Sequence, residues 1–428
     1  MALVVGSLAL GGRHSTRSGS TAGATLAALE SKLLVIEQRV EKIRGVQFTH
    51  RPLPVLVSGA EVRRQGLAEL DKQVPPATQA ANDELLKLLG LIPPQSNLRA
   101  IQGEVFSDQV AGFYDPATKR LALVRDAGAT DAAIGEITLA HELTHALDDQ
   151  RFGIRDQAPG MGDGATAYSA LVEGDATSVM TRYATKYMTG SNLLGVLFAS
   201  SSATGPRLPP YILATLEFPY IEGQRFVDTL FRYGRGWTLV NFAFRFHPPV
   251  STAQILHPLL YAQNVKPLPV RLRVRPLLPR AWRPVLGGTL GEFDTRELIQ
   301  RGLPGDRAAT AAATWRGGGY QLWRLGALPD PRCAGPCRQR DALVAAWRTA
   351  PGRDAQTLAA GVSAYVSKGL GGRARGRNVW ALPGSAAAVS TQGGTTVLAL
   401  APSVASAQQL ALRAAPPLTS QRAPRVRP

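Results

Sequence analysis

Two histidines four residues apart constrain this chain more than any other feature. They lie in the segment Ala140 to Leu147, which reads Ala-His-Glu-Leu-Thr-His-Ala-Leu. Apolar residues recur around it at helical spacing, so we expect a helix from about Asp131 to Gln150. Side chains four residues apart on a helix project from the same face, and the imidazoles of His141 and His145 can therefore reach one metal ion.

Glu142 follows the first histidine directly. From this position its carboxylate can accept a proton from a water molecule held on the same ion. The pattern therefore predicts a zinc centre in which His141 and His145 are ligands and Glu142 is the catalytic base. The alternative is that both histidines lie on the exposed face of an amphipathic helix.

A catalytic zinc uses three protein ligands and leaves one position open. The best third ligand is Glu173, which lies in Ala-Leu-Val-Glu-Gly-Asp-Ala within a second predicted helix, Tyr168 to Met188. A lone carboxylate in such an apolar stretch is costly unless it is paired or binds a metal. Asp148 and Asp149 compete for the role, but they share the histidine helix and the geometry would be cramped. Glu173 could instead form a structural ion pair or be exposed.

These motifs resemble the gluzincin branch of the zincin metallopeptidases. His-Glu-Leu-Thr-His-Ala-Leu with a downstream Glu is similar to thermolysin, and Val-Glu-Gly-Asp-Ala at 172–176 is similar to the third-ligand stretch of aminopeptidase N-type enzymes. More loosely, Val110 to Pro116 resembles a stretch that precedes the zinc helix in uncharacterised bacterial proteins of this type. The resemblance covers roughly residues 105–190. It implies the same ligands, His141, His145 and Glu173, with Glu142 as the base.

The resemblance further implies a sheet whose edge strand lines the substrate cleft. Two short runs, Gln109 to Tyr114 and Arg120 to Arg125, flank turn-forming residues and predict a β-hairpin that could supply this strand. It also implies a residue that orients a ligand histidine. Thermolysin-like enzymes have an Asp four positions after the ligand Glu, where this chain has Thr177, so Asp149 or Asp175 would have to substitute.

Peptide hydrolysis by such a centre also needs a hydrogen-bond donor for the tetrahedral oxyanion. His257 is the first candidate, with Tyr114 and Tyr220 behind it. A structural role for His257 is an equally good interpretation, so it is left out of the predicted site.

The charge of the chain is distributed unevenly. The formal net charge is +17, from 48 Lys and Arg against 31 Asp and Glu. Residues 1–200 contain 19 basic and 21 acidic residues, so residues 201–428 contain the remaining 29 and 10. The basic C-terminal half could bind an anionic surface such as an envelope polymer, lipid headgroups or nucleic acid, or its arginines could simply be dispersed over the surface.

The sequence is compatible with two interpretations of the protein's export and of the oxidation state of its cysteines. Cys333 and Cys337 are the only cysteines, and they either form a disulfide or remain two thiols. The N-terminus is apolar and lacks a positive start, which is compatible with a truncated signal peptide. We expect a secreted or envelope-associated protein, with a cytoplasmic location as the alternative. No apolar run reaches the roughly 18 residues that a transmembrane span needs.

We therefore predict an α+β protein built around a zincin-like metallopeptidase domain. The predicted ranges are a possible signal or disordered segment (1–24), an N-terminal α+β segment (25–104), the catalytic domain (105–264), a small C-terminal α+β domain (265–414) and a disordered basic tail (415–428). The predicted function is zinc-dependent hydrolysis of a peptide or protein substrate. The alternatives are a zinc-binding protein of the same fold without turnover, and a basic module that binds envelope polymers or nucleic acid.

Overall fold

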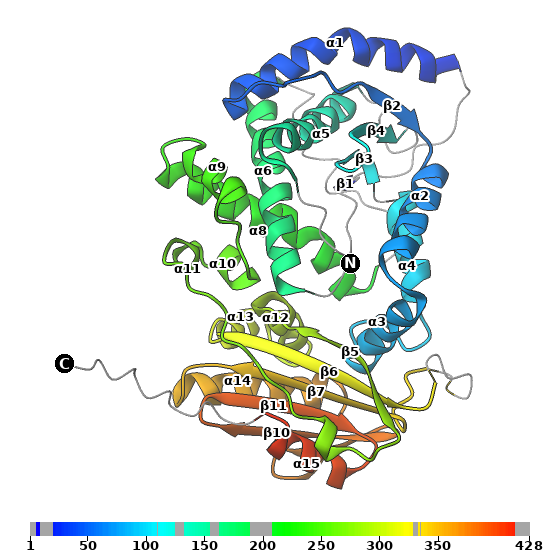
Figure 1. The fold of residues 1–428 in the computed structure, drawn as a ribbon, viewed down its shortest axis with the longest axis vertical. Coiled ribbons are helices and arrows are strands. Elements are labelled where there is room, and N and C mark those ends of the chain that lie inside the picture. Colours follow the sequence, from blue (N-terminus) through cyan, green and yellow to red (C-terminus); the bar gives the residue numbers. More distant parts are fainter. Residues whose placement is uncertain are drawn as a thin grey trace, which may run out of the picture.

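The computed structural model describes residues 6–8, 20–108, 110–124, 132–154, 162–188, 208–327, 333 and 335–415. The protein is a mixed α+β chain with two sheets, as predicted. In the view of Figure 1, the small sheet lies in the upper part with most of the helices, and the large sheet lies below.

The N-terminal third is mainly helical. It contains α1 (Ser20–Arg44), α2 (Gly59–Gln73), α3 (Pro76–Leu88) and α4 (Leu98–Asp108). The small sheet consists of β1 (Gly6–Leu8), β2 (Pro54–Val57), β3 (Val110–Asp115) and β4 (Arg120–Val124), in the order β1-β3-β4-β2. β3 and β4 form the predicted hairpin, and β2 pairs with β4 in parallel. The three predicted ranges 1–24, 25–104 and 105–264 thus all contribute strands to one sheet.

The edge-strand expectation is wrong for both arms of the hairpin. β3 lies between β1 and β4, and β4 lies between β3 and β2. Each strand therefore has backbone partners on both sides. The strands at the edges are β1 and β2, which the hairpin signal cannot reveal because they come from distant parts of the sequence.

The middle of the chain is a stack of helices. It comprises α5 (Ala132–Phe152), α6 (Asp163–Tyr187), α8 (Pro210–Tyr233), α9 (Thr238–Arg245), α10 (Thr252–Leu256) and α11 (Pro258–Ala262). From Leu139 to Asp149 every residue of α5 is buried, because the helix is enclosed by the small sheet, α1 and α6. A helix buried on all sides needs no polar face, so its polar residues are available for a site.

Two glycines bring α6 and α8 into close contact. A Cβ atom added to Gly174 of α6 would lie 2.2 Å from the carbonyl carbon of Gly223 in α8. Added to Gly223, it would lie 2.1 Å from the carbonyl oxygen of Ala170. Only glycine allows the two backbones to approach this closely.

The C-terminal part forms a seven-stranded antiparallel sheet in the order β5-β6-β7-β11-β10-β9-β8. Its strands are β5 (Trp282–Thr289), β6 (Gly317–Leu325), β7 (Asp341–Arg348), β8 (Arg373–Gly376), β9 (Val379–Leu382), β10 (Ser385–Gln392) and β11 (Thr395–Ala401). The 3-10 turn η1 (Arg275–Leu277) precedes them. The helices are α12 (Glu292–Gln300), α13 (Gly305–Ala312), α14 (Arg353–Ala364), which continues into a π-helical turn, η2 (Tyr365–Gly369), and α15 (Val404–Arg413).

The core of this sheet follows strand alternation. On one face Leu343, Ala345 and Trp347 of β7 join a core that continues into α12, α14 and the upper helices. On the other face Ala342 and Val344 pack under α15.

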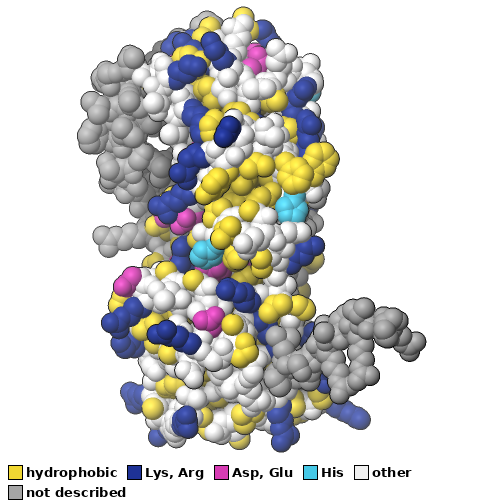
Figure 2. All heavy atoms as spheres, turned by 90° about the vertical axis from the view of Figure 1, so that its left-hand side faces the viewer, with side chains coloured by type: hydrophobic (Ala, Val, Ile, Leu, Met, Phe, Trp, Pro, Cys, Tyr) yellow, Lys and Arg dark blue, Asp and Glu magenta, His cyan; other side chains and the backbone are white. Residues whose placement is uncertain are grey.

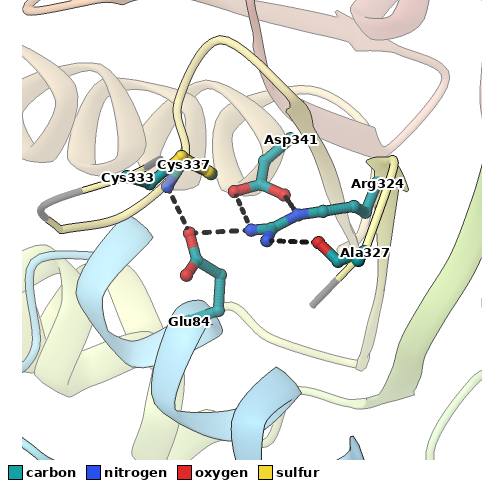
Figure 3. Close-up of a disulfide and its surroundings, with 6 residues drawn as sticks. All are labelled: Glu84, Arg324, Ala327, Cys333, Cys337 and Asp341. Atoms are coloured by element: carbon teal, nitrogen blue, oxygen red, sulfur yellow. Dashed lines mark hydrogen bonds and ion pairs between the residues drawn. A yellow bond between two sulfur atoms is a disulfide. The ribbon is translucent and has the colours of Figure 1, made fainter. Parts of the chain in front are cut away.

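A buried ion cluster joins the N-terminal helices to the large sheet (Figure 3). Arg324 of β6 binds both carboxylate oxygens of Asp341 in β7, at 2.5 and 2.7 Å, and reaches Glu84 of α3 at 3.0 Å. Glu84 also accepts a hydrogen bond from the backbone N–H of Cys337 at 2.6 Å. Cys337 is bonded to Cys333, so of the two alternatives the structure has the disulfide.

None of the helices in the described part of the chain combines the length and the apolar composition that crossing a membrane requires. This agrees with the expectation from the sequence.

Candidate metal centre

The helix α5 places the two histidines one turn apart with their rings converging. The Nε2 atoms of His141 and His145 lie 3.0 Å from each other, and the rings meet edge to face with centroids 4.7 Å apart. Two imidazole nitrogens at this distance face a common point, which is the arrangement that the spacing of four residues predicts.

Glu173 reaches the same point from α6. Its Oε2 atom lies 3.2 Å from His141 Nε2 and 3.4 Å from His145 Nε2. One ligand atom from each of the three residues lies within 4.8 Å of the others, and no residue is more than 1% exposed. This cluster could hold a metal ion. The alternative that the histidines lie on a helix surface is wrong.

The electrostatics of the cluster favour an ionised Glu173. Burial alone would raise the pKa of its carboxyl, but His145 and His141 offset this effect and lower the pKa to about 2. A carboxylate must be deprotonated to bind a metal, so the group is held in the form that ligation requires.

Glu142 and Tyr220 complete the surroundings of the cluster. Glu142 is fully buried on α5. The ring of Tyr220, on α8, stacks on His141 with centroids 6.0 Å apart. Burial raises the pKa of the Tyr220 hydroxyl well above 10, and the charges of Glu173 and Glu142 and a hydrogen bond to Glu173 add to this. Tyr220 is therefore a protonated phenol that can donate a hydrogen bond beside the cluster.

The close contact of α6 with α8 explains how Tyr220 arrives there. Glu173 directly precedes Gly174, and Tyr220 lies three residues before Gly223, so the glycine crossing brings these two side chains together. From the sequence, Tyr220 ranked below His257 as a candidate for the oxyanion donor. No local signal predicts the crossing, although a Gly in each of two apolar helices could have suggested a close approach.

The other two candidate donors lie elsewhere. The Nε2 atom of His257 is 2.7 Å from Glu292, at the junction with the large sheet, and this hydrogen bond raises the pKa of His257. The hydroxyl of Tyr114 donates to Asp149 at 2.8 Å. His257 is thus paired with Glu292, which fits the structural role that the sequence offered as the other interpretation of this residue.

Neither Asp149 nor Asp175 orients a ligand histidine, which corrects the expectation from the resemblance. Asp149 accepts hydrogen bonds from Tyr114 and Lys119, and Asp175 accepts one from Arg44 at 2.8 Å. Within the described residues, the Nδ1 atoms of His141 and His145 have no hydrogen-bond partner. The position of Thr177 is buried, and its hydroxyl likewise has none there.

A buried ion cluster beside the centre has no local signal in the sequence. Arg44, the last residue of α1, lies between Asp148 of α5 and Asp175 of α6, at 3.2 and 2.8 Å, and all three side chains are fully buried. Its guanidinium also donates to Asn241 at 2.7 Å. Arg44 therefore ties α1 to the two helices that supply the ligands. It also shows that Asp148, a competing third ligand, is engaged elsewhere.

Comparisons with known proteins bear on a different part of the chain. A family model described as a domain of unknown function (DUF8575) matches residues 283–411. This range extends from β5 into α15 and contains none of the residues of the metal centre. No curated protein and no solved structure matches the chain.

Proposed function

We propose that this chain is a zinc-dependent peptide-bond hydrolase with His141, His145 and Glu173 as its metal ligands. The observation that carries the proposal is the convergence of the three ligand atoms within 4.8 Å of one another in a buried site. Two imidazole nitrogens and a carboxylate oxygen lie within 3.0 to 3.4 Å of one another there, and a single metal ion would accept a lone pair from each of them.

The order of elements supports a zincin-like domain within residues 105–264. A strand hairpin is followed by a helix with the His-Glu-Leu-Thr-His motif, and then by a second helix that supplies a glutamate. Two nitrogen ligands and one carboxylate are also the set that catalytic zinc uses in peptidases such as thermolysin.

The chemistry of the residues fits hydrolysis. Zinc bound at this site would lower the pKa of a water molecule and polarise a substrate carbonyl. Glu142 would accept the proton from the attacking water and return it to the departing amine. Tyr220, which keeps its proton, would donate a hydrogen bond to the developing oxyanion. The substrate class is a peptide or protein.

One observation favours the second candidate, a zinc-binding protein of this fold without turnover. His141, Glu142, His145 and Glu173 are each at most 1% exposed, so a substrate can reach them only if the surrounding structure opens. A protein that never opens would bind zinc for stability alone.

The experiment that separates these functions is cleavage of an unstructured protein by the purified full chain, with and without a zinc chelator. The matched variant is Glu142→Gln, which leaves the three ligands in place. Chelator-sensitive cleavage that this variant loses supports the hydrolase. Bound zinc with no cleavage by the native chain supports the silent protein, and chelator-insensitive cleavage contradicts the proposal.

A further inference from the structure

A wide basic groove lies on the helical part of the protein. Its volume is about 890 Å³, and α1, α6 and α8 form its walls. It is lined by Lys42, Ile43, Thr181, Arg182, Thr185, Lys186, Arg225, Asp228, Thr229 and Arg232. Five of these ten residues are cations and one is an anion, so the groove suits a negatively charged ligand.

Three of the five cations are available to a ligand. Arg182 is paired with Asp228 at 2.8 Å, and Arg225 is paired with Glu222 at 3.2 Å. Lys42, Lys186 and Arg232 are exposed, and no carboxylate in the described part of the chain forms an ion pair with them. The hydroxyls of Thr185 and Thr229 already donate to backbone carbonyls of their own helices, so an anion would be bound mainly by the cations.

An exposed apolar patch lies next to this groove. Leu239, Phe242 and Phe246 project from one side of α9 and are 37%, 47% and 72% exposed, while Val240, Ala243 and Phe244 on its other side are buried. Tyr233, the last residue of α8, and Leu259 of α11 are also exposed, at 79% and 67%. Figure 2 shows a continuous hydrophobic area on this face, with Lys and Arg side chains around it.

The groove and the patch are held together by direct contacts. Arg232 of the groove and the exposed Tyr233 are consecutive residues. Trp237, at the start of α9, donates a hydrogen bond to the carbonyl of Ile43 at 2.6 Å, and the guanidinium of Arg182 lies over its ring. Two exposed arginines, Arg235 and Arg245, flank α9. Free cations and protruding aromatic side chains therefore share one face.

We propose that this face binds the surface of an anionic phospholipid membrane. Phosphate groups of the lipids would occupy the basic groove, and Phe242 and Phe246 would enter the boundary between headgroups and acyl chains. Charge complementarity argues for an anionic partner, and protruding rather than recessed apolar side chains argue for a fluid surface. Aromatic residues are also the side chains that favour this interface.

The test is co-sedimentation of the full chain with vesicles of phosphatidylcholine that contain about 30 mol% phosphatidylglycerol. Vesicles of phosphatidylcholine alone are the comparison. We expect salt-sensitive binding to the anionic vesicles only. A variant with Lys42→Gln, Lys186→Gln and Arg232→Gln, and a second with Phe242→Ser and Phe246→Ser, should each bind at least about tenfold more weakly.

Matched controls lie on other faces. Arg373→Gln with Arg375→Gln and Arg377→Gln removes three exposed cations from β8 and the turn that follows it, and Leu53→Ser with Leu412→Ser removes two exposed apolar side chains. Both controls should bind within about twofold of the native chain. Equal losses in the controls, or none in the groove and patch variants, would overturn the proposal. Polyphosphate binding that needs the cations but not Phe242 and Phe246, without vesicle binding, would also overturn it in favour of a soluble phosphate polymer.

Discussion

Gly174 and Gly223 touch backbone to backbone where α6 crosses α8, so closely that a Cβ on Gly174 would lie 2.2 Å from the carbonyl carbon of Gly223. The residue before Gly174 is Glu173, the proposed third ligand, and Tyr220 is one helical turn before Gly223. The geometry of the centre thus depends on glycine, which has no side chain, at both positions of the crossing.

We predict that Gly174→Ala or Gly223→Ala destabilises the fold by about 3 kcal/mol or more, because neither backbone can yield without separating the helices. Chemical denaturation measures this directly. Gly305→Ala is the matched control, since no atom lies within 4 Å of its added Cβ. A loss of stability no larger than that of the control would show that the crossing is not this tight.

A second prediction concerns Tyr220. Tyr220→Phe removes the hydroxyl and keeps the ring that stacks on His141. If this hydroxyl stabilises the oxyanion, kcat should fall by about 10²-fold, with little change in KM or in metal content. Tyr114→Phe tests the competing donor and should keep most of the activity, because the Tyr114 hydroxyl is bonded to Asp149. The reverse ranking of the two variants would contradict the assignment.

The convergence of His141, His145 and Glu173 could be predicted from the sequence because its signal is local. The spacing of His141 and His145 on one helix and the apolar surroundings of Glu173 are visible without tertiary information. Tyr220 and Arg44 could not be identified in this way. Tyr220 depends on the crossing of two helices, and Arg44 reaches Asp175 across 131 positions of sequence.

Parts of the fold were missed for a related reason. β6 begins with Gly317, Gly318 and Gly319, a composition typical of a loop. In the structure, a Cβ on Gly317 would lie 2.1 Å from the carbonyl oxygen of Leu268, so this strand needs glycine for close packing. In α2, Gly66 similarly allows the ring of Phe106 to approach. The low strand and helix propensity of glycine therefore argues against β6 and α2, although tertiary contacts require glycine in both elements.

The Arg44 cluster yields a third prediction. Arg44→Met would leave Asp148 and Asp175 buried without a cation, at a cost of about 3–5 kcal/mol. Burial already raises the pKa of Asp148 well above its usual value, although Arg44 opposes the shift.

Adding Asp148→Asn and Asp175→Asn to Arg44→Met should recover much of this loss, because the uncompensated charges are then gone. Lys72→Met is the control, since Lys72 and its partner Glu69 are both exposed, and should cost no more than about 1 kcal/mol. Denaturation of the native chain and these three variants would distinguish a charge effect from simple loss of packing, which the added substitutions would not restore.

A fourth prediction concerns pH. Asp163, at the start of α6, has a pKa raised to about 7 by burial, although hydrogen bonds from Thr252 oppose the shift. The folded chain therefore binds this proton more tightly than the unfolded chain, where the pKa is near 3.8. Its contribution to stability is present at low pH and declines as pH rises from about 4 to about 7, by up to about 4 kcal/mol.

Asp163→Asn mimics the protonated form, and its carbonyl oxygen can still accept from Thr252. Urea unfolding at pH 5 and pH 8 should show a smaller decline for this variant than for the native chain. The exposed Asp306→Asn should leave the pH dependence unchanged. An equal decline in the native chain and Asp163→Asn would rule out Asp163 as its source.

The most direct test of the central claim is the metal content of the purified full chain and of Glu173→Gln, measured by mass spectrometry after dialysis against trace zinc. We predict about one zinc per native chain, a similar content in Glu142→Gln, and a zinc affinity at least about 10²-fold weaker in Glu173→Gln. A native chain that binds no metal, or a Glu173→Gln variant that binds zinc as tightly as the native chain, would contradict the proposed centre.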